Sequence, residues 1–134
     1  MDKKLKCVLL VDDDGTTNFI NYRIIYKLNI AEKIHTEING EKALNFLQFY
    51  SENNNNNCPE LIILDLKMPV LDGFGVLEYL QIKKFANKDK VKIIVLTTSM
   101  YADDLQSLKR FNVEYIAKPL TEKKFLNLLE DITY

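Results

Sequence analysis

The sequence predicts an α/β fold in which helices cover both faces of a five-stranded parallel sheet. Short apolar runs of strand length alternate along the chain with longer segments whose apolar residues recur at helical spacing. This alternation repeats five times, and right-handed crossovers between parallel strands place helices on both faces of the sheet. At 134 residues the chain has the length of one domain. We therefore expect a single domain over residues 1–134, with its core within residues 6–132.

Two strand–helix units are predicted in the first third of the chain. The run 7–11 is continuously apolar, as expected of a strand buried on both faces. The shorter strand 34–38 contains polar residues and is expected to be more exposed. Apolar residues at helical spacing indicate a helix after each strand. They are Phe19, Ile20, Ile24 and Leu28 in the first helix, and Ala43, Leu44 and Leu47 in the second.

Three further units follow an Asn-rich segment, 51–58, which is expected to be a loop outside the core. Strands are predicted at 61–64, 91–96 and 113–117, because each is a short and largely apolar run. The helices after them are expected to bury Phe74, Leu77 and Leu80; Leu105, Leu108 and Phe111; and Phe125, Leu128, Leu129 and Ile132. For this alternation we expect the strand order 2-1-3-4-5 of a flavodoxin-like, doubly wound sheet with five helices.

The composition argues against several classes of function. Eighteen basic and nineteen acidic residues leave a net charge of -1, so no broad basic surface is expected to bind nucleic acid or anionic lipid. The apolar runs are too short for a membrane span or a signal segment. Cys7 and Cys58 lack metal-binding spacing and are typical of reduced thiols, which favours a cytoplasmic protein.

Reactive side chains follow the predicted strands at the points where the strands end. They are Asp12 and Asp13 after the first strand, Asp65 after the third, Thr97 after the fourth and Lys118 after the fifth. Parallel strands place these ends at one edge of the sheet, where α/β proteins bind ligands. Three carboxylates at close range repel each other unless a cation lies among them, and oxygen ligands alone favour Mg²⁺. With Lys118 and Thr97 as donors to an oxyanion, the set predicts attack by a carboxylate on a phosphoryl group.

Four motifs together resemble those of the response-regulator receiver domain. They are Val11-Asp12-Asp13, Leu64-Asp65-Leu66-Lys67-Met68-Pro69 with Asp72-Gly73, Leu96-Thr97-Thr98 and Ala117-Lys118-Pro119. Their order on successive strand ends makes the set specific, and the match extends from the first strand to the last helix. The resemblance implies a two-component regulator that accepts a phosphoryl group on Asp65 from a histidine kinase or histidine phosphotransfer protein. It implies no other enzyme activity than the protein's own phosphorylation and dephosphorylation.

The resemblance also implies a role for each residue of the metal site. Asp13 and Asp65 would coordinate Mg²⁺ directly, together with the backbone carbonyl of Lys67, and Asp12 would act mainly through water. Lys118 would hold the phosphoryl oxygens, within a Lys-Pro peptide bond that is cis in the family.

A switch is implied as well. Thr97 would move toward the phosphoryl group and Tyr115 would follow it, which alters the surface formed by the fourth helix, the fifth strand and the fifth helix. A downstream protein target would read this surface. The Lys67 side chain and Ser99 would border the site and tune hydrolysis of the phosphoryl group.

Asp14 and His35 are expected to have structural rather than reactive roles. Asp14 extends the acidic run and could belong to the metal pair, but its position directly before a helix favours a capping role. His35 lies on a half-exposed strand and is not expected to bind metal or carry a phosphoryl group.

Two other functions share parts of this pattern. A haloacid-dehalogenase-type phosphatase also uses an aspartate and Mg²⁺, but it requires a second aspartate two residues later, where Lys67 stands. A flavodoxin-like flavin binder would place phosphate beside Gly15, where three aspartates would repel it. The chain ends soon after the last predicted helix, so we expect a stand-alone regulator like those of chemotaxis, either monomeric or dimeric on phosphorylation. A module excised from a hybrid histidine kinase or longer regulator stays the alternative.

Overall fold

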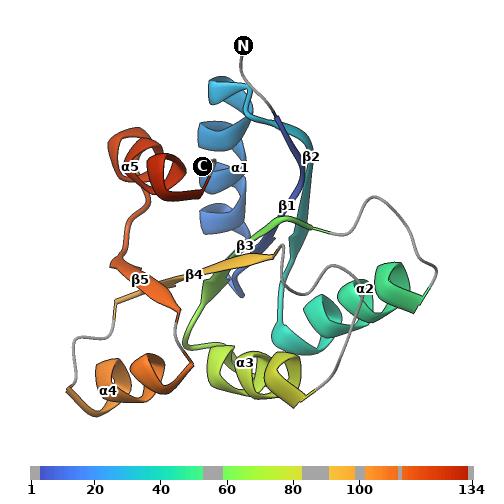
Figure 1. Ribbon diagram of the computed structural model, residues 1–134, viewed down its shortest axis with the longest axis vertical. Coiled ribbons are helices and arrows are strands. Elements are labelled where there is room, and N and C mark those ends of the chain that lie inside the picture. The colour runs from blue at the N-terminus through green and yellow to red at the C-terminus, as the bar shows by residue number, and fades with distance from the viewer. Residues whose placement is uncertain (1–3, 53–58, 83–90, 99–101, 112, 133–134) are drawn as a thin grey trace.

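A five-stranded parallel sheet forms the centre of the structure (Figure 1). The structure is a computed structural model that describes residues 4–52, 59–82, 91–98, 102–111 and 113–132. Within these residues the strands lie in the order β2-β1-β3-β4-β5 and all pair in parallel, which confirms the predicted topology. Their bounds are β1 Leu5–Val11, β2 Ala31–Glu37, β3 Leu61–Asp65, β4 Lys92–Thr97 and β5 Glu114–Ala117.

Helices cover both faces of the sheet, as predicted (Figure 1). Their bounds are α1 Gly15–Leu28, α2 Gly40–Glu52, α3 Gly73–Ile82, α4 Ala102–Arg110 and α5 Glu122–Ile132. Helices α1 and α5 lie on one face, whereas α2, α3 and α4 lie on the other. None of the helices in the described ranges is long and apolar enough to span a membrane.

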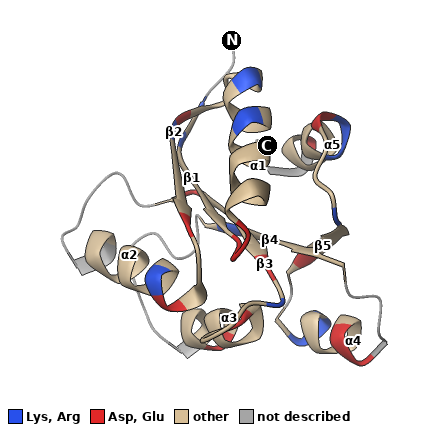
Figure 2. Ribbon diagram, turned by 180° about the vertical axis from the view of Figure 1, so that it is seen from behind, with Lys and Arg blue, Asp and Glu red and all other residues tan. Residues whose placement is uncertain are grey.

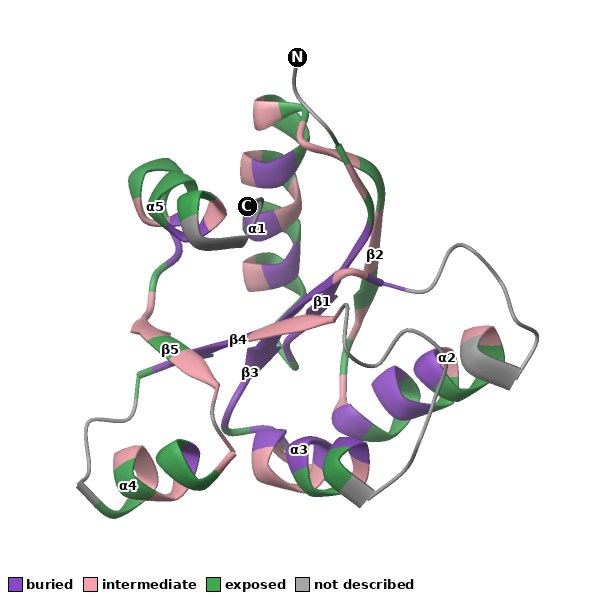
Figure 3. Ribbon diagram, in the orientation of Figure 1, coloured by how far each residue is buried: buried purple, intermediate pink, exposed green. Residues whose placement is uncertain are grey.

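Two hydrophobic clusters form the core, one on each face of the sheet. In β1, Leu9 and Val11 pack with α2, α3 and α4, whereas Val8 and Leu10 pack with α1 and α5. Successive side chains of a strand point to opposite faces, so a continuously apolar run is what a strand covered on both sides requires. Figure 3 shows that β3 is buried along its length and β1 from Cys7 onward, while the outer sides of the helices are exposed.

Helix α1 forms where the apolar spacing predicted a helix, but only part of that spacing faces the core. Phe19 and Ile20 are 59% and 51% exposed, whereas the buried residues of this helix are Asn18, Asn21 and Ile25. These three recur at helical spacing, and the Nδ2 of Asn18 donates to two backbone carbonyls at the sheet edge, while its buried Oδ1 has no hydrogen-bond partner among the described residues. Leu28 packs against the core and Ile24 is half-buried, so the apolar spacing marks the helix but does not identify its buried face.

Several predicted boundaries differ from the observed ones by one to three residues. β2 begins at Ala31 rather than at residue 34, because its pairing with β1 already starts at the Leu5–Ala31 pair. Ser51 and Glu52 form the end of α2 rather than a loop. The rest of the Asn-rich segment, 53–58, lies outside the described residues.

Candidate functional site

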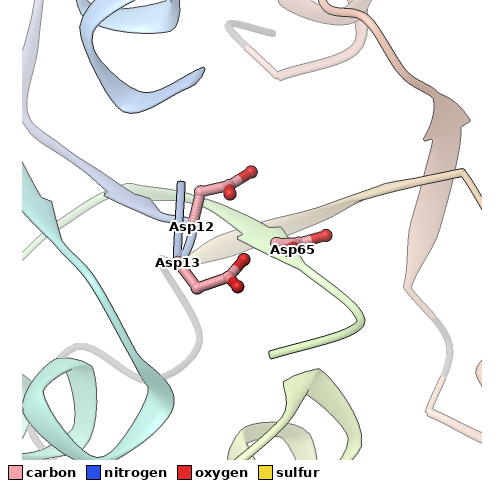
Figure 4. Close-up of side chains that lie close together, drawn as sticks. All are labelled: Asp12, Asp13 and Asp65. Carbon is pink, nitrogen blue, oxygen red and sulfur yellow. The ribbon is translucent and has the colours of Figure 1, made fainter. Parts of the chain in front are cut away.

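Three carboxylates meet where β1 and β3 end (Figure 4). One oxygen each from Asp12, Asp13 and Asp65 lies within 4.8 Å of the others. β1 and β3 are neighbours, and Val11 of β1 pairs with Leu64 of β3. The residues that come next, Asp12 and Asp65, therefore lie beside each other. Asp12 and Asp65 are buried and Asp13 is exposed, so the cluster opens to solvent on one side.

A lysine from the far strand of the sheet reaches the same cluster. Lys118 follows β5, and its Nζ donates to Asp12 Oδ2 at 2.8 Å and lies 3.2 Å from Asp65 Oδ1. The Lys118 backbone N–H donates to the Thr97 carbonyl at 3.1 Å, which continues the pairing of β4 with β5. The Lys118–Pro119 peptide bond is cis. Figure 2 shows basic residues on α1, α2, α4 and α5 and acidic residues on α2, α3, α4 and α5, so charges of both signs are spread over the described helices.

Burial and neighbouring charges both shift the titration of this cluster. Burial and the neighbouring Asp12 carboxylate raise the pKa of Asp65 from its ordinary value of 3.8 to about 6, against the opposing effect of Lys118. Burial alone would lower the pKa of Lys118, but its hydrogen bond to Asp12 and the charge of Asp65 outweigh burial and raise it. One ammonium group therefore does not neutralise the cluster.

The donor atoms of this cluster suit a hard divalent cation. All three are carboxylate oxygens, and they outnumber the single ammonium group of Lys118, so further positive charge would be favourable here. Asp12 is the least available of the three, because its Oδ1 accepts from the Asp14 N–H and its Oδ2 from Lys118. Asp13 and Asp65 are therefore less engaged than Asp12, although Asp65 Oδ1 lies 3.2 Å from Lys118 Nζ.

Sequence reasoning missed a residue that holds the acidic loop in place. Asn18, in α1, is buried, and its Nδ2 donates to the carbonyls of Asp12 at 3.0 Å and Glu37 at 3.1 Å. It therefore joins the ends of β1 and β2 at the point where the acidic residues begin. The signal in the sequence was its spacing of seven residues from the buried Ile25. Asp14 accepts from the Thr16 N–H as the N-cap of α1, as predicted.

Glycine and a second cap fix the loop after Asp65. A Cβ at Gly73 would lie 2.7 Å from the Asp65 carbonyl oxygen, so only glycine permits α3 to start this close to the end of β3. Asp72 Oδ1 accepts from the Gly75 N–H at the start of α3. The exposed Lys67 side chain forms an ion pair with Asp104 of α4 at 3.3 Å.

The remaining predicted residues lie further along the same edge or away from it. Thr97 is buried at the end of β4, and Tyr115 is 37% exposed on β5. Because Tyr115 pairs with Val95 and Thr97 with Ala117, their side chains lie on the same face of the sheet. Ser99 lies outside the described residues. His35 lies on β2, where it contacts Glu37 at 2.6 Å and stacks on the Phe46 ring.

The raised pKa of Asp65 predicts how stability depends on pH. The folded protein binds this proton more tightly than the unfolded chain, so the free energy of unfolding should fall as the pH rises from about 4 to about 6. In metal-free buffer that contains a chelator, the free energy of unfolding of Asp65→Asn at pH 7 should therefore exceed that of the wild type by up to about 3 kcal/mol. Urea unfolding at a series of pH values measures the difference, which should shrink toward pH 4. A difference independent of pH would contradict this.

The fold and the carboxylates at the edge of the sheet define the class of a signalling receiver module. The family model described as response regulator receiver domain matches residues 8–130. The chain belongs to this family, as its motifs suggested.

Similar proteins agree with this assignment. The probable methanogenesis regulatory protein FilR2 of Methanothrix harundinacea is 31% identical, over 93% of this chain and 79% of that protein. The response regulator Rcp1 of Synechocystis is 30% identical, over 95% of this chain and 86% of that protein. A crystal structure of a two-component response regulator from Cytophaga hutchinsonii superimposes with a TM-score of 0.85 at 28% identity, and 98% of each chain is covered.

Proposed function

We propose that residues 1–134 act as one receiver domain that accepts a phosphoryl group on Asp65 in a Mg²⁺-dependent reaction. The observation that carries this proposal is the meeting of Asp65 with two other carboxylates and the Lys118 ammonium at the carboxyl edge of the sheet. This arrangement provides a nucleophile, ligands for a metal and a cation for an oxyanion within one small region.

The reaction forms one bond and breaks one. A carboxylate oxygen of Asp65 attacks phosphorus, and the bond from phosphorus to the donor's imidazole nitrogen, or to the oxygen of acetyl phosphate, breaks. Lys118, which already contacts Asp65, stabilises the phosphoryl oxygens with its ammonium group. Asp13, Asp65 and the backbone carbonyl of Lys67 would hold Mg²⁺, which neutralises charge on the phosphoryl group when bound. Asp12 acts through water and through Lys118, because both of its oxygens already accept hydrogen bonds.

The output of the reaction is a change at the surface of α4, β5 and α5. The added charge draws the Thr97 hydroxyl toward the phosphoryl group, and Tyr115 on the same face of the sheet follows. The altered surface binds a downstream protein target. Lys67 and Ser99 tune how long the phosphoryl group persists.

The phosphodonor is a histidine kinase or a histidine phosphotransfer protein, as membership of the family implies. The exposed Phe19 and Ile20 of α1 lie just after the acidic loop, and Tyr26 extends this apolar surface along the helix. Exposed apolar surface next to a reactive group is typical of a protein-binding site. We propose this surface for contact with the donor in the cytoplasm.

Labelling with a small phosphodonor tests the proposal without a kinase. The wild type, incubated with acetyl phosphate and Mg²⁺, should gain the mass of one phosphoryl group, because the chemistry requires only the residues of the site. Removing Mg²⁺ with EDTA should prevent the gain. Intact-protein mass spectrometry measures both. An unlabelled protein that is folded and binds Mg²⁺ would overturn the proposal, as would labelling that EDTA does not affect.

A further inference from the structure

A second lysine holds the backbone on both sides of Lys118. Lys124 lies in the first turn of α5, and its Nζ donates to the carbonyl of Ala117 at 2.8 Å and to that of Pro119 at 2.9 Å. These carbonyls belong to the residues immediately before and after Lys118. A single ammonium group therefore brackets the residue whose side chain reaches the acidic cluster.

Lys124 lies near the N-terminus of α5, where a lysine does not stabilise the helix. The Thr121 side chain accepts from the Lys124 N–H, so Thr121 caps α5 and Lys124 is the third residue after the cap. The N-terminus of a helix carries partial positive charge and favours acidic residues, often glutamate at this position. A lysine here is unfavourable for the helix by itself. The two carbonyl oxygens supply the negative partial charge that the helix end does not.

The hydrogen bond from Lys124 to the Ala117 carbonyl helps to hold the peptide group between Ala117 and Lys118 in place. The Lys118 N–H donates to the Thr97 carbonyl on β4, and in a trans peptide the Ala117 carbonyl points the opposite way. β5 is an edge strand, so that carbonyl faces away from the sheet. Lys124 binds it there. The peptide group before Lys118 is thus held by β4 at one end and by α5 at the other.

We propose that Lys124 is a positioning residue, which holds the Lys118 backbone so that the Lys118 ammonium reaches Asp65 and the phosphoryl group. This inference rests on the proposed function for its effect on phosphorylation, but the geometry at Lys118 exists without it. Lys124 contacts none of the three acidic residues through any hydrogen bond or ion pair within the described ranges. Its loss should therefore impair phosphorylation but not Mg²⁺ binding.

The test compares Lys124→Met with Lys123→Met and Lys124→Arg. Lys123 is the matched control, because it is adjacent, exposed and equally charged, and its side chain makes no hydrogen bond or ion pair to the described part of the chain. Lys124→Arg keeps a charged donor at the same position. Three quantities are measured: hydrogen exchange of the Lys118 amide without metal or donor, the Mg²⁺ dissociation constant by calorimetry, and the rate of labelling by acetyl phosphate.

Lys124→Met should exchange the Lys118 amide about tenfold faster than the wild type, while the Asp12 amide is unchanged. Its labelling rate should fall about tenfold, because Lys118 is displaced from its productive position. Its Mg²⁺ affinity should be no weaker than that of the wild type. Lys123→Met should match the wild type in all three measurements, and Lys124→Arg should recover most of the labelling rate.

Equal behaviour of Lys124→Met and Lys123→Met would overturn the proposal, because only net charge would then matter. A parallel loss of Mg²⁺ affinity and labelling would also overturn it, because it would indicate general loosening of the fold. If Lys124→Met does not fold, Lys124→Gln, which has a shorter and uncharged donor, replaces it with the same expectations. A wild type that takes no label would refute the proposed function, whereas hydrogen exchange at Lys118 would still decide the role of Lys124.

Discussion

Replacing Asp65 by asparagine is expected to abolish labelling by acetyl phosphate in the presence of Mg²⁺. The two side chains have the same shape, but the amide is not a nucleophile toward phosphorus and carries no charge to bind a metal. The fold should persist, because Asp12 still accepts from Lys118 when Asp65 is changed. Intact-protein mass spectrometry should show the added phosphoryl group on the wild type and none on the variant.

Asp14→Asn provides a matched control for this experiment. It removes the same charge within the acidic run, and asparagine caps a helix about as well as aspartate does. Its labelling should resemble that of the wild type, because Asp14 already serves as the cap of α1. A labelled Asp65→Asn protein would show that the phosphoryl group is carried elsewhere. Loss of labelling in Asp14→Asn would show that Asp14 belongs to the reactive site.

Asp13→Asn is expected to weaken Mg²⁺ binding at least about tenfold, since affinity for a hard cation depends on the charge of its ligands. Asp13 is the exposed member of the cluster, whereas both oxygens of Asp12 are engaged by Asp14 and Lys118. Calorimetric titration with Mg²⁺ measures the dissociation constant. Labelling by acetyl phosphate at low Mg²⁺ should fall in parallel.

The same Asp14→Asn variant separates a metal ligand from a general effect of charge. It should keep a Mg²⁺ dissociation constant close to that of the wild type. If the two variants weaken binding equally, the metal responds only to the overall field of the acidic run, and the assignment of Asp13 as a ligand is wrong.

The fold could be predicted from the sequence because its central strands are buried on both faces. The part of such a strand that is covered on both sides must be apolar, so β1 and β3 stand out as the continuous apolar runs 7–11 and 61–64. The parallel topology then brings Asp12, Asp13, Asp65 and Lys118 to one edge without any knowledge of side-chain contacts. Residues at strand ends were predictable because topology alone decides where they meet.

The residues that support the site could not be predicted in the same way. The apolar residues of α1 mark the helix but do not identify its inward face, because Asn18 is buried there through hydrogen bonds of its Nδ2 to two backbone carbonyls that no periodicity reveals. Lys124 looks like an ordinary surface lysine until the path of the chain around Pro119 is known. A polar side chain that binds a backbone carbonyl leaves no pattern in the sequence, because every residue has a backbone carbonyl whatever its type.

Chemical mapping of the phosphorylated residue tests the central claim most directly. Borohydride reduces an aspartyl phosphate to homoserine, and peptide mass spectrometry locates the product. After treatment with acetyl phosphate and Mg²⁺, we expect homoserine at position 65 and at no other acidic residue, and none when EDTA is present. Homoserine at another position, or its absence from a folded protein that binds Mg²⁺, would contradict the account.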